Sequence, residues 1–197
     1  MTVFYLVRHG EHEVQDRLLV GRAPGVALSP RGRAQAGRLA LRLAGEDIAA
    51  VLASPLQRAQ ETAAPIAARL GLPVVTDDAL DEIDVGRWTG RPVAELAGDP
   101  DFQRFNSFRS GSPPPGGETM LDVQRRMVAL VERLRRERPG ARVALVSHGD
   151  PIKAVLAYYL GVPLDLFQRI EVATGSLSRL EVEEWGPRVL ASNEVPL

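Results

Sequence analysis

The fold is decided by a stretch near the start of the sequence, Val3-Phe4-Tyr5-Leu6-Val7-Arg8-His9-Gly10. Its first five residues are all apolar and of types that favour β-structure, a pattern typical of a strand buried on both faces. The run ends at Arg8, after which an imidazole and a glycine follow. We therefore expect a central strand over 3–7 and a loop that carries Arg8 and His9 at its carboxyl end.

The same arrangement returns near the other end of the sequence, in Val143-Ala144-Leu145-Val146-Ser147-His148-Gly149. An apolar run, a polar residue, a histidine and a glycine again occur in this order. Because the carboxyl ends of parallel strands open on a common crevice, we expect His9 and His148 to face the same space. The glycine beside each histidine permits the close backbone approach that an anion site requires.

Strand and helix signals alternate along most of the chain, which predicts an α/β fold with a doubly wound, largely parallel sheet and helices on both faces. Further strands are expected at 48–53, 74–75, 143–146 and, two or three of them, within 170–195. Helices are expected after Ser29-Pro30, after Ser54-Pro55, and over 118–138 and 151–160. In both Ser-Pro pairs the serine can cap a helix and the proline fits its first turn.

The composition changes over residues 91–117. Three of the five phenylalanines lie here at a spacing of three, Phe102, Phe105 and Phe108. The run Pro113-Pro114-Pro115-Gly116-Gly117 then breaks any helix. We interpret 91–117 as a helical insertion over the active site, within a single domain of residues 1–197. Its phenylalanines are expected either to wall an apolar part of the substrate pocket or to pack on the core as an ordinary helix stripe.

The composition excludes several classes of protein. Without cysteine, the 197-residue chain can form no disulfide, thiolate zinc site or cysteine nucleophile. Its 24 basic and 25 acidic residues give a net charge of -1, so no nucleic-acid partner is expected. No apolar run is long enough to span a membrane or resembles a cleaved leader, so we expect no membrane partner and a cytoplasmic location.

Two arginines are placed to bind an anion in the crevice of His9. Arg8 precedes it, and Arg58 lies in the first turn of the helix expected after Ser54-Pro55. A guanidinium donates paired hydrogen bonds to phosphate oxygens, and the start of a helix adds a favourable dipole. A neutral imidazole beside a bound phosphoryl group is a competent nucleophile, so His9 would form a phosphohistidine.

The leaving oxygen of a phosphate ester needs a proton, and the acidic segment 77–90 can supply it. We take Glu82 as the general acid and then as the base that activates water. Spacing alone does not select this residue, and a solvated acidic loop is the alternative interpretation. The other carboxylates of the segment are Asp77, Asp78, Asp81 and Asp84.

Short motifs follow one another along nearly the whole chain. They are Arg8-His9-Gly10-Glu11, Leu28-Ser29-Pro30-Arg31-Gly32-Arg33-Ala34-Gln35-Ala36, Ser54-Pro55-Leu56-Gln57-Arg58-Ala59-Gln60-Glu61-Thr62-Ala63, the segment 82–90, Pro115-Gly116-Gly117-Glu118-Thr119 and Val146-Ser147-His148-Gly149. In this order they resemble the motifs of the histidine phosphatase superfamily, the phosphoglycerate-mutase-like proteins, and within it the small bacterial phosphatases.

The resemblance implies a phosphoglycerate-mutase-like three-layer sandwich and a metal-independent phosphomonoesterase of the histidine acid phosphatase type. It implies that His9 takes the phosphoryl group and that Glu82 donates the proton. The residues implied for phosphate and substrate binding are Arg8, Arg58, His148 and Gly149. No metal or other cofactor is implied, and the histidines and acids show none of the short ligand spacings of a zinc site.

Two positions depart from the pattern of the family. Many members follow the Arg-His-Gly-Glu motif with Thr or Ser and, three residues further on, with Asn. Here these places hold His12 and Gln15. Gln15 can still donate to a phosphate oxygen, so we expect it to contact substrate. We expect His12 to be a surface residue.

Three functions remain for comparison. The first is a phosphatase acting on a small phosphorylated metabolite through phospho-His9. The second is a phosphoglycerate-type phosphomutase that shares the phosphohistidine step; mutases of this family look longer, with larger basic insertions, whereas 91–117 is short. The third is a catalytically idle phosphate- or partner-binding module, which would need neither nucleophile nor acid. A homodimer is expected from exposed strands in the tail.

Overall fold

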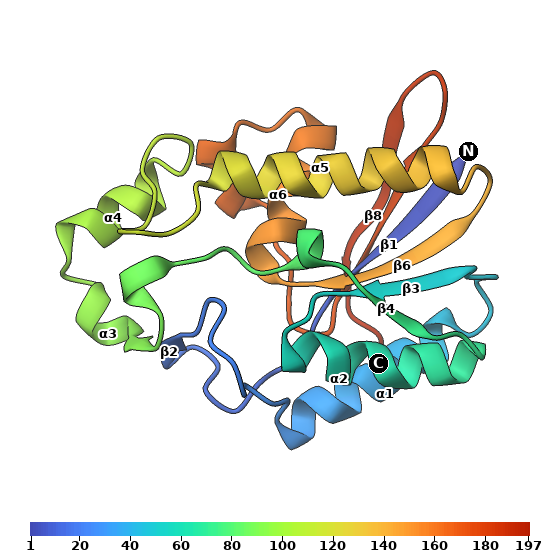
Figure 1. Ribbon diagram of the computed structural model, residues 1–197, viewed down its shortest axis with the longest axis horizontal. Helices are drawn as coiled ribbons and strands as arrows, with labels where there is room; N and C mark the ends of the chain where they lie inside the picture. Colours follow the sequence, from blue (N-terminus) through green and yellow to red (C-terminus); the bar gives the residue numbers. More distant parts are fainter.

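A six-stranded sheet, in the order β4-β3-β6-β1-β7-β8, forms the centre of the computed structural model, which describes residues 1–197 (Figure 1). β1 lies inside this sheet between β6 and β7, as its continuous apolar sequence predicts. The strands are β1 (Thr2–Arg8), β3 (Ala50–Ala53), β4 (Val74–Thr76), β6 (Arg142–Ser147), β7 (Leu177–Val182) and β8 (Pro187–Glu194).

The first four strands of this order are parallel, and the last two are antiparallel to their neighbours. The prediction of a largely parallel sheet is therefore confirmed. In the register of β1 and β6, Arg8 pairs with Ser147. The two histidines that follow these residues consequently leave the sheet at the same edge. β8 lies at the outer edge of the sheet, and homodimerisation through it stays a prediction.

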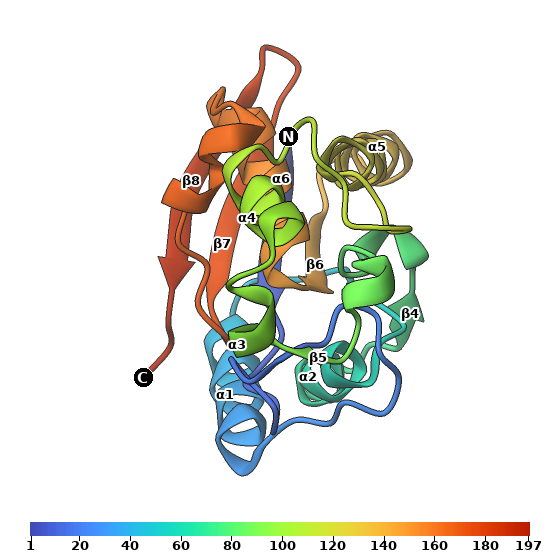
Figure 2. The ribbon, with the colours of Figure 1, turned by 90° about the vertical axis from the view of Figure 1, so that its left-hand side faces the viewer.

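Helices cover both faces of the sheet, which gives the expected three layers (Figures 1 and 2). Alternate residues of β1 point to opposite layers, as the two-residue period of a strand requires. Val3, Tyr5 and Val7 pack with α1 (Pro30–Leu43) and α2 (Gln57–Leu70). Phe4 and Leu6 pack with α5 (Met120–Glu137) and α6 (Gly149–Leu160). None of the helices combines the length and apolar character needed to cross a membrane.

The beginnings of two helices differ from the sequence prediction. α1 begins as expected, because the Ser29 hydroxyl accepts a hydrogen bond of 3.0 Å from the N–H of Gly32. α2 instead begins at Gln57, because the Ser54 hydroxyl bonds outside the helix and reaches only the N–H of Leu56. α6 begins at Gly149, directly after His148, rather than at Pro151.

The segment 91–117 contains a short strand and two short helices rather than one helix. These are β5 (Arg91–Pro92), α3 (Val93–Leu96) and α4 (Pro100–Ser107). β5 pairs with β2 (Leu18–Leu19), which joins the segment to the loop that follows the first histidine. Figure 2 shows α3 and α4 in front of the carboxyl ends of the central strands. The acidic segment 77–90, expected as a loop, contains the 3-10 turns η1 (Asp78–Leu80) and η2 (Gly86–Trp88).

Candidate active site

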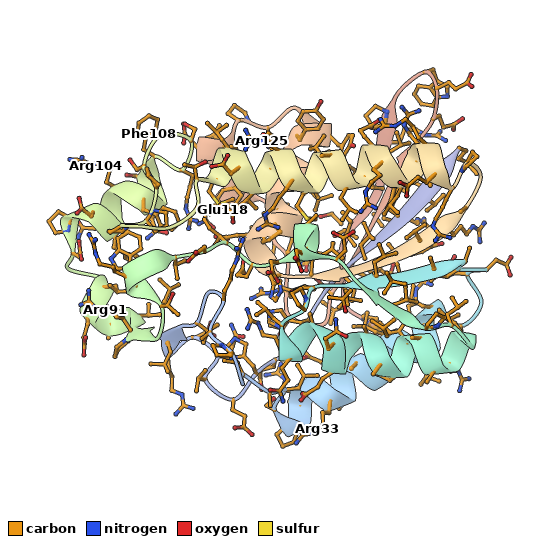
Figure 3. The ribbon with its side chains drawn as sticks, viewed as in Figure 1. Arg33, Arg91, Arg104, Phe108, Glu118 and Arg125 are labelled. Carbon is orange, nitrogen blue, oxygen red and sulfur yellow. The ribbon has the colours of Figure 1, made fainter.

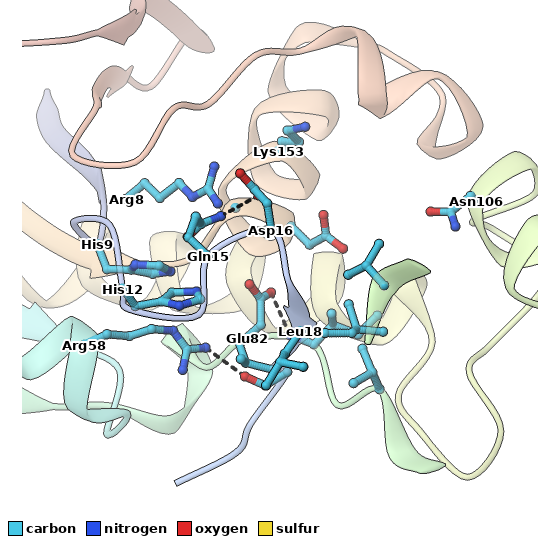
Figure 4. A pocket seen from close by; sticks show the side chains of 18 of the residues that line it. Arg8, His9, His12, Gln15, Asp16, Leu18, Arg58, Glu82, Asn106 and Lys153 are labelled. Atoms are coloured by element: carbon cyan, nitrogen blue, oxygen red, sulfur yellow. Dashed lines mark hydrogen bonds between the residues drawn. The ribbon is translucent and has the colours of Figure 1, made fainter. Parts of the chain in front are cut away.

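A cavity of about 270 Å³ opens where β1 and β6 end (Figure 4). It contains most of the residues that the sequence singled out. Those that line it are Arg8, His9, Gln15, Arg58, Glu82 and Gly149. His148 does not line the cavity, but its ring centroid lies 5.0 Å from that of His9. The structure therefore brings together residues from both ends of the chain.

His9 is held in one tautomer by its own loop. Its Nδ1 lies 2.7 Å from the carbonyl oxygen of Gly10, a contact that requires the proton on Nδ1. The lone pair then lies on Nε2. Burial, followed by the positive charges of Arg58 and Arg8, holds the pKa of His9 well below its ordinary value. The imidazole is consequently neutral near pH 7 and carries a free nitrogen, as a nucleophile must.

Gly10 fixes the position of this loop. A Cβ at this residue would lie 2.5 Å from the carbonyl oxygen of Gly32 in α1, so only glycine allows the loop and the helix to approach so closely. The N–H of Gly10 donates to the Thr62 hydroxyl at 3.1 Å, and that hydroxyl donates to the carbonyl of Arg58 at 2.7 Å. The loop of His9 is therefore anchored to both α1 and α2.

Two guanidinium groups lie above and below the imidazoles of the site (Figure 4). Arg8 donates from Nη1 to the carbonyl of Val172 at 2.6 Å, and Arg58 donates from Nη2 to the carbonyl of Gly21 at 2.7 Å. The Nε of Arg8 and both Nε and Nη1 of Arg58 are buried without a partner. Buried N–H groups are nearly always bonded, so these unpartnered donors indicate a site built for an anion.

His148 is fully buried beside these arginines. Its Nε2 lies 2.8 Å from the Ser54 hydroxyl, and its Nδ1 has no partner. Burial holds its pKa well below the ordinary value, and the positive charge of Arg58 adds to this effect. His148 is therefore a neutral imidazole in the free protein.

Glu82 is the one carboxylate of the acidic segment that lines the cavity. Loss of hydration, followed by the nearby charge of Asp150, raises its pKa to about 7, and Arg58 opposes this shift. A carboxyl group with such a pKa can both donate and accept a proton near neutrality. Its backbone carbonyl accepts hydrogen bonds from Arg22 at 2.7 Å and Arg126 at 3.3 Å, which hold it in place.

Three of the other four carboxylates of the segment have partners outside the cavity, and Asp78 does not line it. Asp77 pairs with Arg133 of α5, Asp81 accepts from the Ser54 hydroxyl, and Asp84 accepts from the N–H of Gly86. Its position in the cavity thus distinguishes Glu82 from the neighbouring acids, which spacing along the sequence could not do.

The prediction that His12 is a surface residue is wrong. The side chain is only 5% exposed and lines the cavity, with its ring centroid 5.7 Å from that of His9. A backbone bridge between His12 and Leu28 draws this part of the loop inward. Burial, followed by the charges of Arg58 and Arg8, lowers the pKa of His12 to about 4. Its Nδ1 is buried without a partner.

Gln15 lies in the cavity, where its role as a substrate contact stays a prediction. Its side-chain nitrogen donates to Asp16 at 2.9 Å, and its oxygen is buried without a partner. Asp16 has a φ of 61°, a left-handed conformation that aspartate tolerates better than most residues. The turn after His12 therefore directs two polar side chains towards the site.

The phenylalanines of the insertion divide into two groups. Phe102 and Phe105 line the cavity, and their ring centroids lie 5.3 and 5.5 Å from that of Trp88. Phe105 is also buried in the core cluster beneath α4, so it both lines the cavity and packs on the core, while its contact with substrate stays a prediction. Phe108 is 50% exposed and lies on the outside of the insertion (Figure 3), away from the cavity.

A charged group of the cavity was missed from the sequence. The Arg109 guanidinium lies 3.8 Å from the ring centroid of Phe105 and pairs with Asp150 at 2.8 Å. Asp150 directly follows the Val146-Ser147-His148-Gly149 motif, so this position could have identified Asp150 as a residue near the site. Arg109 lies in the loop after α4, where nothing in the sequence distinguishes it from the many other arginines. Asn106 and Lys153 complete this side of the cavity.

The model of the histidine phosphatase superfamily (branch 1) matches residues 4–195. The chain belongs to this family. Phosphoserine phosphatase 1 of Hydrogenobacter thermophilus is 34% identical over 189 residues, which are 93% of this chain and 88% of that protein. Probable phosphoglycerate mutase GpmB of Yersinia pestis is 32% identical over 186 residues, 93% of this chain and 86% of the relative.

The fold of this histidine phosphatase is shared with solved structures. The structure of Bacillus stearothermophilus YhfR matches with a TM-score of 0.93 at 31% identity, covering 99% of this chain and 98% of that one. The match confirms the phosphoglycerate-mutase-like fold predicted from the ordered motifs. No group of three or more His, Cys, Asp or Glu side chains in the structure is arranged to hold a metal ion.

Proposed function

We propose that this histidine phosphatase hydrolyses a small phosphate monoester through a phosphohistidine on His9, without a metal ion. One observation carries the proposal: a neutral imidazole with a free Nε2 lies between two guanidinium groups, each of which keeps at least one buried N–H donor without a partner. A phosphoryl group bound there would satisfy these donors and present its phosphorus to the nucleophile.

The first step transfers the phosphoryl group. Nε2 of His9 attacks phosphorus, the bond from phosphorus to the ester oxygen breaks, and the protonated carboxyl of Glu82 gives its proton to that oxygen. Arg8, Arg58 and His148 stabilise the oxygens of the phosphoryl group as charge spreads over them. The products of this step are the free alcohol, phospho-His9 and the carboxylate of Glu82.

The second step returns the site to its starting state. The Glu82 carboxylate accepts a proton from water while the water oxygen attacks the phosphorus of phospho-His9. The bond from phosphorus to Nε2 breaks, and inorganic phosphate leaves. A pKa of about 7 suits both steps, because a group used as acid and then as base works best with a pKa near the operating pH.

The shape of the cavity favours a small ester with an apolar side. At about 270 Å³ it lies near the lower end of ligand pockets, with Phe102 and Phe105 as one wall. Similar proteins include a phosphoserine phosphatase, whose substrate is of this size class. We propose a small phosphorylated metabolite as the substrate.

The phosphomutase alternative is not favoured, because a mutase must retain a substrate that bears a second phosphate. The cations beyond the first phosphate site are already engaged: Arg109 pairs with Asp150, and Lys153 contacts Gln168. An assay of phosphoglycerate interconversion, with and without a bisphosphorylated primer, separates the two activities.

The function is tested with a panel of phosphate esters in the presence of a chelator. We expect metal-independent release of phosphate and, in rapid-quench experiments, label trapped on His9. His9→Ala should lower kcat by about 10,000-fold or more and abolish the label. Undiminished labelling in this variant would contradict the proposed nucleophile, and absence of hydrolysis across the panel would favour an idle binding module.

A further inference from the structure

A chain of hydrogen bonds connects His148 to a carboxylate that the proposed reaction does not use. The Ser54 hydroxyl lies 2.7 Å from Oδ1 of Asp81 and 2.8 Å from Nε2 of His148. Ser54 directly follows β3, His148 directly follows β6, and Asp81 directly follows η1. Both Ser54 and His148 are fully buried, so water does not compete for these bonds.

The direction of each bond follows from the donors available. The carboxylate of Asp81 can only accept, so the Ser54 hydroxyl gives its proton to Asp81. The serine oxygen then accepts from the N–H of Leu56 at 3.2 Å and from Nε2–H of His148. In the neutral imidazole the second nitrogen, Nδ1, therefore carries a lone pair, and this atom has no partner.

This tautomer has a consequence for phosphate binding. A lone pair on Nδ1 repels the oxygen of a phosphoryl group, whereas a proton on Nδ1 donates to it. Since Nε2 is already protonated by its bond to Ser54, a second proton makes His148 a cation. The carboxylate at the far end of the chain then stabilises this cation through the serine.

We propose that Asp81 and Ser54 are positioning residues that prepare His148 to take up a proton on Nδ1 when a phosphoryl group binds. The inference rests on the proposed function, because it takes the phosphoryl group as the anion that His148 meets. Asp81 acts through Ser54 and touches neither substrate nor nucleophile.

The charges around the two ends of the chain are consistent with this assignment. His148 faces Arg58 of α2, Arg126 of α5, Arg8 at the end of β1 and the neutral His9. Burial and the charges of the three arginines keep His148 neutral while the site is free. A phosphate dianion reverses that balance. Asp81 faces Arg22 and Arg126, with the carboxylate of Asp78 as a further neighbour.

The experiment uses the fact that the protein has only three histidines. The full chain is labelled with ¹⁵N-histidine, and ring nitrogen signals are assigned with His9→Gln and His12→Gln. At pH 7.5, saturation with inorganic phosphate should convert His148 from one protonated nitrogen to two. Orthovanadate serves as a second probe of the same site.

Asp81→Asn preserves the shape of the side chain and removes its charge. We expect it to weaken phosphate binding about tenfold, to leave bound His148 neutral, and to shift its protonation to lower pH. Asp78→Asn is the matched control, since it removes a neighbouring carboxylate without a bond to Ser54, and should change affinity less than about twofold. Ser54→Ala should match or exceed the loss in Asp81→Asn; if it does not fold, Asp81→Asn alone decides.

A singly protonated His148 at saturating phosphate, or equal affinities for Asp81→Asn and Asp78→Asn, would overturn the inference. These readouts do not require turnover. Hydrolysis by a protein whose His148 stays neutral would support the proposed function and overturn the inference on His148. Protonation of His148 without hydrolysis of any ester would support the inference on His148 and overturn the proposed function. If wild-type protein bound neither phosphate nor vanadate, both would fail.

Discussion

The phosphate-facing cluster and the wall of the insertion are built in different ways. Arg8 ends β1, His9 and His148 follow the adjacent strands β1 and β6, whose register is fixed by the sheet, and the loop of His9 packs against α1 and is bonded to α2. The wall stands on the short helix α4 and is held mainly by contacts among aromatic rings. From this difference we expect the chemistry of the site to depend on the sheet and the choice of substrate to depend on the insertion.

The two regions also differ in how their arginines are paired. The guanidinium groups of Arg8 and Arg58 keep unpartnered donors, whereas Arg109 at the wall is neutralised by Asp150. Anion binding is therefore expected in the cluster at the ends of the strands rather than at Arg109. Substitutions in the two regions should separate catalysis from substrate selection.

Among the substitutions that leave the nucleophile in place, the largest effect is expected for Arg58→Ala. This side chain is 1% exposed and supplies unpartnered donors beside His9, so its loss should lower kcat/KM by about 100- to 1,000-fold. Steady-state kinetics measures it, with circular dichroism to establish folding. Arg58→Lys keeps the charge without the fork and should recover only part of the activity. A folded Arg58→Ala with wild-type kinetics would remove the arginine from the mechanism.

Glu82→Gln should remove the pH dependence of activity that arises from the titration of Glu82. The raised pKa means that Glu82 is protonated, and able to donate, below about pH 7, and that the donor is lost as pH rises through this value. Activity of the wild type on alkyl phosphates should therefore fall above pH 7. Glu82→Gln should lose about 100-fold at pH 6 and show no such fall.

The control for this prediction is the leaving group. p-Nitrophenol leaves without a proton, so the formation of phospho-His9 from its phosphate ester, measured as the burst of released alcohol, should be affected much less by Glu82→Gln than the same step with an alkyl ester. Equal losses on both esters in this first step would assign Glu82 to binding rather than to proton donation.

A smaller effect is expected for His12, which lies between the two regions. His12→Thr installs the residue type that many family members carry at this place. Because the imidazole contributes an unpartnered nitrogen to the cavity, we expect KM to rise about tenfold and kcat to change less. Kinetics across the ester panel measures this change, and a uniform loss of kcat would instead place His12 in the chemistry.

The smallest effect on chemistry is expected at the wall. Phe105→Ala should raise KM for esters with an apolar alcohol by about tenfold, leave kcat nearly unchanged, and lower stability by about 3 kcal/mol because Phe105 is also core. Phe108→Ala is the matched control, since this phenylalanine is half-exposed and outside the cavity. An unchanged substrate profile in a folded Phe105→Ala protein would remove the aromatic wall from substrate selection.

The sequence predicted the parts of the site that backbone geometry controls. The apolar runs before His9 and His148 identify two buried strands, and parallel pairing then places both histidines at one edge. Arg58 was found because the Ser-Pro pair before it ends a strand and precedes a helix. These features depend on local pattern and on general rules of sheet topology, which leave few alternatives.

The remainder depends on contacts between segments far apart in the chain. The bridge from His12 to Leu28 turns an apparently exposed residue inward, and no local pattern encodes it. Arg109 is held over the cavity by its ion pair with Asp150, which lies 41 residues further along the chain. α2 begins later than the sequence predicts because Ser54 bonds to Asp81, a partner that spacing along the chain cannot reveal.

The position of β1 inside the sheet constrains how the protein is made. β1 is synthesised early, yet its neighbours are β6 and β7, which begin at Arg142 and Leu177. During translation this apolar strand must wait unpaired while most of the chain emerges from the ribosome, a state exposed to aggregation and to capture by chaperones. A ribosome-bound fragment ending before residue 142 should therefore lack an assembled nucleophile loop and resist proteases poorly.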